Sequence, residues 1–251
     1  MVVLSSLFLW WLACVTSQTT FARIAWRGYH RPDIALFLDR NDATLAMEIG
    51  NYYFNGGAYD IEKAKRAFER AREIDPKLVG TRFQLSRIEF LRSHFETALA
   101  LANEEFAIHP EFDRVYYLRG LIYGYADDLP RAAEDFQQFL KTHEHSWAGH
   151  NDLAWIYFRQ GKFEKVAEIA KRGLELNPGN AWLLATYGTA LLNINKKDEA
   201  RRVLSEALAN IEKLTLENWG DAYPGNNPKI YAQGLDEMKK TIKKNLDLAS
   251  K

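Results

Sequence analysis

A repeat of 34 residues runs through most of this 251-residue chain and limits the folds open to it. Four columns of residues recur at this interval: two of mostly small residues, one of apolar residues and one of prolines. The columns are Ser86, Gly120, Ala154 and Gly188; Ala64, Ala98, Ala132, Val166 and Ala200; Phe68, Ala102, Phe136, Ala170 and Leu204; and Pro76, Pro110 and Pro178. Because the columns stay in phase over as many as five periods, the chain is expected to stack one structural unit on the next.

Each column has a physical reason in a pair of antiparallel helices. A small residue on each helix lets the two backbones approach closely, and an apolar residue four positions after the second small one lies on the same helical face. Proline ends the second helix because it lacks an N–H group and clashes with the preceding turn. The repeat therefore predicts ten helices in five antiparallel pairs over residues 43–214, and no β-strand.

The pattern resembles the tetratricopeptide repeat, which has the same period. The clearest copy spans residues 147–180 and carries Leu153, Ala154, Tyr157, Gly161, Phe163, Ala170 and Pro178. The resemblance implies an all-α, right-handed solenoid with repeats at about 43–78, 79–112, 113–146, 147–180 and 181–214. Two departures affect local geometry. Extra residues around positions 56–59 lengthen the turn of the first repeat, and Glu89 stands where an aromatic residue is usual.

Both flanks of the array are expected to carry helices. Residues 23–42 are interpreted as a juxtamembrane segment with a short helix from Pro32, whose apolar side is Ile34, Leu36, Phe37 and Leu38. Residues 215–251 are interpreted as a loop, from Gly220 to Pro228, and a helix from Lys229 to Leu248. The apolar stripe of this last helix is Ile230, Leu235, Met238, Ile242 and Leu246. We expect it to cap the array, and the alternative is a basic amphipathic helix on a membrane or a partner.

The first 22 residues contain no charged side chain, and their apolar part runs from Val2 to Val15. Its length lies between that of a signal-peptide core and that of a spanning helix. We interpret residues 1–22 as a single-pass membrane anchor; the alternatives are a signal cleaved near Ser17 and a buried terminal helix. Arg23, Arg27 and Arg31 follow this segment, which slightly favours a cytoplasmic position for the repeats.

Charge and cysteine content exclude some classes of function. Lys and Arg number 33, as do Asp and Glu, and the resulting zero net charge argues against a nucleic-acid binder, which would show a basic excess. The single cysteine, Cys14, excludes a disulfide within the chain and a Cys/His metal finger.

No motif for phosphate binding, dinucleotide binding, serine hydrolysis or zinc hydrolysis is present. The nearest group to a metal site is His143, Glu144, His145 and His150, to which we assign structural roles because the repeat register places them at a repeat junction. No catalytic residue, cofactor or metal is therefore predicted, and the chain is expected not to be an enzyme.

The resemblance implies a groove lined by the first helix of each repeat, where a protein or peptide partner binds. The family's groove stations correspond here to Met47, Asn51, Phe54, Asn55, Phe83, Arg87, Phe90, Leu91, Tyr117, Leu121, Tyr125, Asn151, Trp155, Phe158, Arg159, Trp182, Ala185, Thr189 and Asn193. Such aromatic content suits a peptide with apolar anchors, although some of these residues are equally suited to packing between repeats. One branch of the family grips a C-terminal carboxylate with a lysine, asparagine and arginine cluster; only Asn51 matches it, so that function is disfavoured.

The favoured hypothesis is a membrane-tethered scaffold for protein–protein interaction. One alternative is a soluble scaffold exported to the cell envelope after signal cleavage. Another is a non-catalytic accessory subunit of a membrane enzyme complex.

Overall fold

The structure, a computed structural model, describes residues 2–55, 58–223 and 225–251, with only the backbone of residues 2–13 and 15. It divides into two compact units, Met1–Ile88 and Glu89–Lys251, and each is described by itself. The protein is all-helical, with 78% of its residues in helices, and no strand is present in the described ranges. The lengthened turn predicted around residues 56–59 involves Gly56 and Gly57, which lie outside the described residues.

The first unit begins with four helices. They are α1 (Val2–Arg27), α2 (Pro32–Leu38), α3 (Ala43–Asn55) and α4 (Ile61–Ile74), and α5 (Thr81–Leu91) starts in this unit and ends in the next. Helices α3 and α4 form an antiparallel pair in which the ring of Phe68 lies against Gly50. The short helix predicted at Pro32 is present, but Ala35 is its buried residue, while Phe37 is 68% exposed. Of its predicted apolar side, Leu36 and Leu38 pack against the core cluster of this unit, whereas Ile34 and Phe37 are exposed, because α2 packs chiefly on α1.

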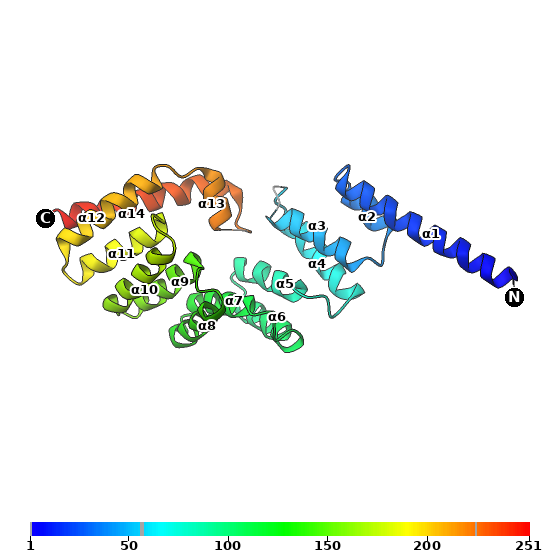
Figure 1. Cartoon of the computed structure of the whole chain (residues 1–251), viewed down its shortest axis with the longest axis horizontal. Coiled ribbons are helices and arrows are strands. Elements are labelled where there is room, and N and C mark those ends of the chain that lie inside the picture. The colour runs from blue at the N-terminus through cyan, green and yellow to red at the C-terminus, as the bar shows by residue number, and fades with distance from the viewer. Residues whose placement is uncertain (1, 56–57, 224) are drawn as a thin grey trace. The chain divides into compact units, whose positions relative to one another are not determined.

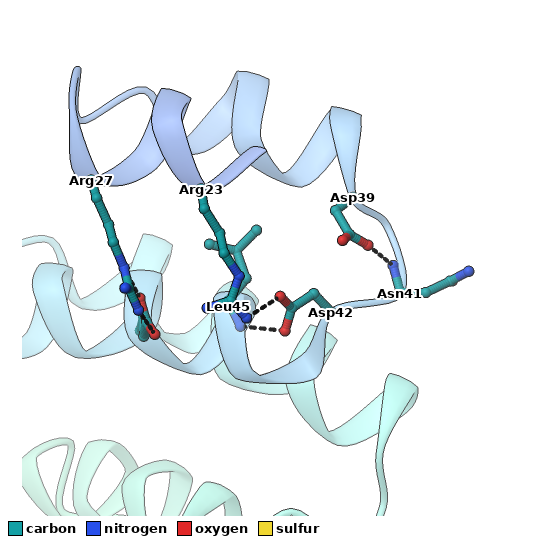
Figure 2. A network of polar contacts seen from close by, with 7 residues as sticks. Arg23, Arg27, Asp39, Asn41, Asp42 and Leu45 are labelled. Carbon is teal, nitrogen blue, oxygen red and sulfur yellow. Dashed lines mark hydrogen bonds and ion pairs between the residues drawn. The ribbon is translucent and has the colours of Figure 1, made fainter. Parts of the chain in front are cut away.

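Helix α1 ends inside the first unit. Its second half buries Ala22 and Trp26, and the Trp26 ring meets Tyr52 of α3 edge-on. Figure 2 shows Arg23 and Arg27 reaching from α1 towards the start of α3. Arg23 bonds Asp42, the residue before α3, at 2.8 Å, and Arg27 bonds Glu48 of α3 at 2.7 Å.

The predicted membrane anchor over residues 1–22, and the membrane localisation with it, are wrong, since no helix in the described part of the chain is long and apolar enough to cross a bilayer. Polar residues follow the short apolar stretch, and the arginines that suggested a cytoplasmic side form ion pairs: Arg23 with Asp42, Arg27 with Glu48 and Arg31 with Asp33. Met1 and the side chains of residues 2–13 lie outside the described structure.

The second unit contains the remaining helix pairs, in which each helix packs on the next along the chain (Figure 1). They are α6 (Phe95–Ile108), α7 (Arg114–Tyr125), α8 (Leu129–Thr142), α9 (Trp147–Arg159), α10 (Phe163–Leu176), α11 (Ala181–Asn193) and α12 (Lys197–Ile211). Between residues 43 and 214 the described chain thus forms ten helices, α3 to α12, as the repeat predicts. Ala98, Ala132 and Ala200 of the small-residue column are fully buried.

The C-terminal segment covers the last repeat. Helix α14 (Tyr231–Ala249), preceded by a 3₁₀ turn at Pro228–Ile230, packs on α12 and α11 and buries Leu235 and Ile242, which supports the predicted cap. Ile230, predicted on its apolar stripe, is half exposed because it precedes the helix. The predicted loop begins too early, since α13 (Leu216–Ala222) forms behind a capping box between Thr215 and Asn218. Pro224 of that loop lies outside the described residues.

Candidate partner-binding face

The predicted groove residues of the second unit lie on the first helices of its repeats. We call the side of α7, α9 and α11 that carries them the first-helix face. Hydrogen bonds tie these helices together: the Tyr117 hydroxyl donates to Asp152 Oδ2 at 2.5 Å, and Thr186 Oγ1 donates to Asn151 Oδ1 at 2.8 Å. Each bond joins residues 35 apart, one repeat plus one position, so neighbouring first helices are held in register.

Aromatic side chains gather in a row at one end of this face. The ring of Tyr125 lies 5.3 Å from that of Phe90 and 5.2 Å from that of Trp155, measured between centroids. Phe158 follows one turn after Trp155 and contacts Phe163 at 5.3 Å. Tyr125 is 57% exposed and Phe158 is 39% exposed. Large apolar surface left in water in this way is typical of a binding surface.

The Arg159 side chain is held by hydrogen bonds beside this row. Its guanidinium donates to the carbonyl of Gly124 at 2.6 Å and to the carboxylate of Asp127 at 2.8 Å. It also lies over the Trp155 ring, 5.3 Å from its centroid. These bonds reach the last turn of α7 and the turn that follows it, so the arginine links two repeats.

Asp152 is an acidic residue on this face that the sequence analysis did not single out. Its carboxylate is half-buried and accepts from Tyr117 and, at 3.4 Å, from the amide of Asn151. Burial raises the pKa of Asp152 to about 6, and the two hydrogen bonds oppose this rise. Burial, with a contribution from the charge of Asp152, also raises the pKa of Tyr125 and brings that of Tyr223 to about 12.

Other predicted groove residues serve to pack the structure. Trp182 is only 9% exposed: its ring contacts those of Trp147 and Trp219, and its indole N–H donates to the Tyr223 hydroxyl at 2.9 Å. Leu121 packs in the core between α7, α8 and α9. The segment after α12 thus covers Trp182, the groove position of the last repeat. The spacing of the repeats does not predict this contact.

The final stations are engaged by polar contacts. Thr189 Oγ1 donates to the carbonyl of Ala185 at 2.7 Å and accepts from Asn245 of α14 at 3.0 Å. The amide of Asn193 donates to the Thr189 carbonyl at 2.8 Å, and its side chain remains exposed. The cap therefore reaches the edge of the first-helix face.

In the first unit, the predicted stations mostly contact one another. Phe54 and Phe83 are buried, and Met47 is half-buried. Arg87 lies over the Phe54 ring at 4.5 Å and donates to Gln84, whose own amide donates to Asn51 at 2.6 Å. Asn51, which alone matched the carboxylate-gripping cluster, is thus held within a side-chain network.

The histidines at the junction of the third and fourth repeats point to different partners. His143 stacks on Phe139 with 4.4 Å between ring centroids, whereas His145 is exposed. His150 is buried, which lowers its pKa, and its Nε2 lies 2.8 Å from the carbonyl oxygen of Glu144. Throughout the ranges that the structure describes, no three His, Cys, Asp or Glu side chains are grouped as metal ligands.

Stacked antiparallel helix pairs with small residues where the helices meet define a tetratricopeptide-repeat solenoid. Two models of that family, both described as tetratricopeptide repeat, match residues 117–181 and 161–213. The tetratricopeptide repeats expected from the sequence are therefore confirmed.

Known proteins with similar sequences are larger. The chain is 26% identical over 137 residues to the Hsp70-Hsp90 organizing protein of Triticum aestivum, covering 55% of this chain and 24% of that protein. It is 24% identical over 149 residues to the BBSome complex member BBS4 of Bos taurus, covering 59% and 28%. The chain thus spans about a quarter of the length of these curated relatives.

Solved structures share the fold. PilW, a widely conserved type IV pilus biogenesis factor, superposes with a TM-score of 0.62 at 14% identity over 81% of this chain and 91% of that one. MamA superposes with a TM-score of 0.57 at 21% identity over 68% and 92%. Tetratricopeptide-repeat proteins bind protein or peptide partners and are typically non-catalytic, so the fold is consistent with an interaction scaffold.

Proposed function

We propose that the chain is a scaffold that binds a peptide segment of a partner protein along the first-helix face of residues 89–251. The observation that carries this proposal is the exposed aromatic row of Tyr125, Trp155 and Phe158. Aromatic side chains dominate binding energy at interfaces. Tyr125 and Trp155 are held by their contact across neighbouring repeats, and Phe158 by its contact with Phe163. An extended or helical segment would place apolar anchors against them.

The test is a selection of displayed random peptides on the full chain, followed by calorimetry with the enriched peptides. The double variant Tyr125→Ser, Phe158→Ser removes the two most exposed rings of the row. We expect it to weaken binding by about tenfold or more, since interface aromatics commonly contribute over 1 kcal/mol each. Ile108→Ser is the matched control, because Ile108 is also exposed but lies on α6, the second helix of its repeat.

Two results would contradict the proposal. One is the failure of any peptide to be enriched on the parent protein. The other is equal binding by the double variant and the parent, with circular dichroism showing that both are folded, because the enriched peptides would then bind at another surface.

A further inference from the structure

The carboxylate of Asp152 lacks a compensating charge. It accepts hydrogen bonds only from neutral groups, the hydroxyl of Tyr117 and the amide of Asn151. Over the described ranges it forms no ion pair with a basic side chain. The arginine nearest along the same helix face, Arg159, is committed to Gly124 and Asp127. A half-buried charge without a counter-charge is costly, so its retention calls for a reason.

The groups around this carboxylate are those that favour a cation. The phenol of Tyr117 donates its hydroxyl to the carboxylate, and the charge of Asp152 contributes to the raised pKa values of Tyr125 and Tyr223. Trp155, one helical turn after Asp152, has its ring 5.2 Å from that of Tyr125. Aromatic faces attract ammonium and guanidinium groups, and the attraction grows when water is partly excluded. An acid among such rings suits a positively charged side chain.

We propose that Asp152 receives a lysine or arginine side chain of the bound partner, beside an apolar anchor on the Tyr125–Trp155 pair. This inference rests on the proposed function and specifies its ligand. The bound cation would supply the missing counter-charge while its aliphatic stem covers the aromatic rings. Buried ion pairs across an interface fix register and reject partners of the wrong charge. The face would therefore disfavour an acidic segment at this position.

The charge of the neighbouring groups supports this choice of occupant. A partner carboxylate or phosphate would meet Asp152 with like charge, which is unfavourable across an interface. A purely apolar anchor would cover the carboxylate and leave it buried without a counter-charge. Only a basic side chain removes both costs.

The experiment repeats the peptide selection on three forms of the full chain at neutral pH: the parent, Asp152→Asn and Asp198→Asn. Asparagine keeps the shape of Asp152 and an oxygen that accepts from Tyr117, so the fold is expected to persist. Asp198→Asn removes the same charge from an exposed site on α12, a second helix, and is the matched control. We expect the peptides enriched on the parent and on the control to share a basic residue at one fixed position, next to an apolar one. The peptides enriched on Asp152→Asn should lack it.

Calorimetry with one enriched peptide then tests direct contact. Replacing its basic residue by norleucine should weaken binding to the parent by about tenfold or more and leave binding to Asp152→Asn nearly unchanged, because residues in contact are coupled in a double-mutant cycle. An unchanged basic preference with Asp152→Asn would overturn the inference, as would additive effects in the cycle. Enriched peptides without a basic position would also overturn it while leaving the proposed function intact. If the parent enriches no peptide, the proposed function itself fails.

Discussion

Gly188 on α11 lies directly against Leu204 on α12: a Cβ added to the glycine would come within 2.6 Å of the leucine Cγ. Gly120 has the same relation to Phe136, where the added Cβ would be 3.0 Å from ring atoms. These are members of the small and apolar columns of the repeat. The columns therefore record close approach between the two helices of one pair.

Replacing Gly188 by valine is expected to destabilise the fold by about 1–3 kcal/mol, because overpacking forces shifts in side chains and backbone. Urea denaturation followed by circular dichroism would measure the change in the free energy of unfolding. Ala209→Val on the exposed side of α12 is the control and should cost only the difference in helix propensity, roughly 0.5 kcal/mol. Equal stability of Gly188→Val and the parent would contradict the assigned contact.

The contacts within helix pairs could be predicted from the sequence because they recur at a fixed interval. Contacts that do not recur could not be predicted in this way. Trp182 occupies a groove station, yet Trp219 and Tyr223 of the C-terminal segment cover it. The one sequence signal for a helix in that segment is the Thr215–Asn218 capping box. It precedes a Gly- and Pro-rich stretch that predicts a loop.

The candidate site was predicted in part, because the groove positions recur with the repeat. Family stations led to Tyr125, Trp155 and Phe158, which the structure leaves exposed or half-buried. Asp152 lies one position beyond the station at Asn151, and its hydrogen bond comes from Tyr117 of the preceding repeat, a contact that the sequence does not show. The predicted anchor was wrong because the apolar stretch ends at Val15 and polar residues follow it, so no helix in the described part of the chain is long and apolar enough to cross a bilayer.

The ion pair between Arg119 and Asp135 provides a second prediction. Two hydrogen bonds of 2.9 and 2.6 Å join the guanidinium to the carboxylate, and Asp135 is buried. Arg119→Ala should cost about 3–5 kcal/mol, because it leaves a buried carboxylate without a partner. The control is Arg201→Ala, which breaks an exposed pair with Asp198 and should cost at most about 1 kcal/mol. Similar losses of unfolding free energy for both variants would contradict this assignment.

Trp182 provides a third prediction, which separates packing from binding. Because its indole is buried between Trp147 and Trp219, Trp182→Ala should lower the free energy of unfolding by about 3–5 kcal/mol. Tyr125→Ala, at an exposed ring, should cost far less stability and instead weaken peptide binding. Thermal denaturation and calorimetry on both variants would measure the two effects. If Trp182→Ala is as stable as the parent but binds peptide more weakly, Trp182 contacts the partner and is not a packing residue.

The last prediction concerns pH and follows from the raised pKa of Asp152. In the folded chain this pKa is about 6, against an ordinary value of 3.8. Between these values the folded state holds a proton that the unfolded state has released, so the group's contribution to stability falls as pH rises from about 4 to 6. Tyr125 and Tyr223, whose pKa values are raised by burial and by the charge of Asp152, stay protonated throughout this window.

Asp152→Asn cannot titrate and should escape this loss. Relative to the parent, its free energy of unfolding should rise through this window and level off above pH 6, with a total gain of at most about 3 kcal/mol at 1.36 kcal/mol per pKa unit. Urea denaturation at a series of pH values measures the difference, with Asp198→Asn as the matched control for loss of one carboxylate. A difference between Asp152→Asn and the parent that stays constant across the window would show that Asp152 titrates alike in both states. In that case the carboxylate would be solvated, and a solvated carboxylate needs no cation from a partner.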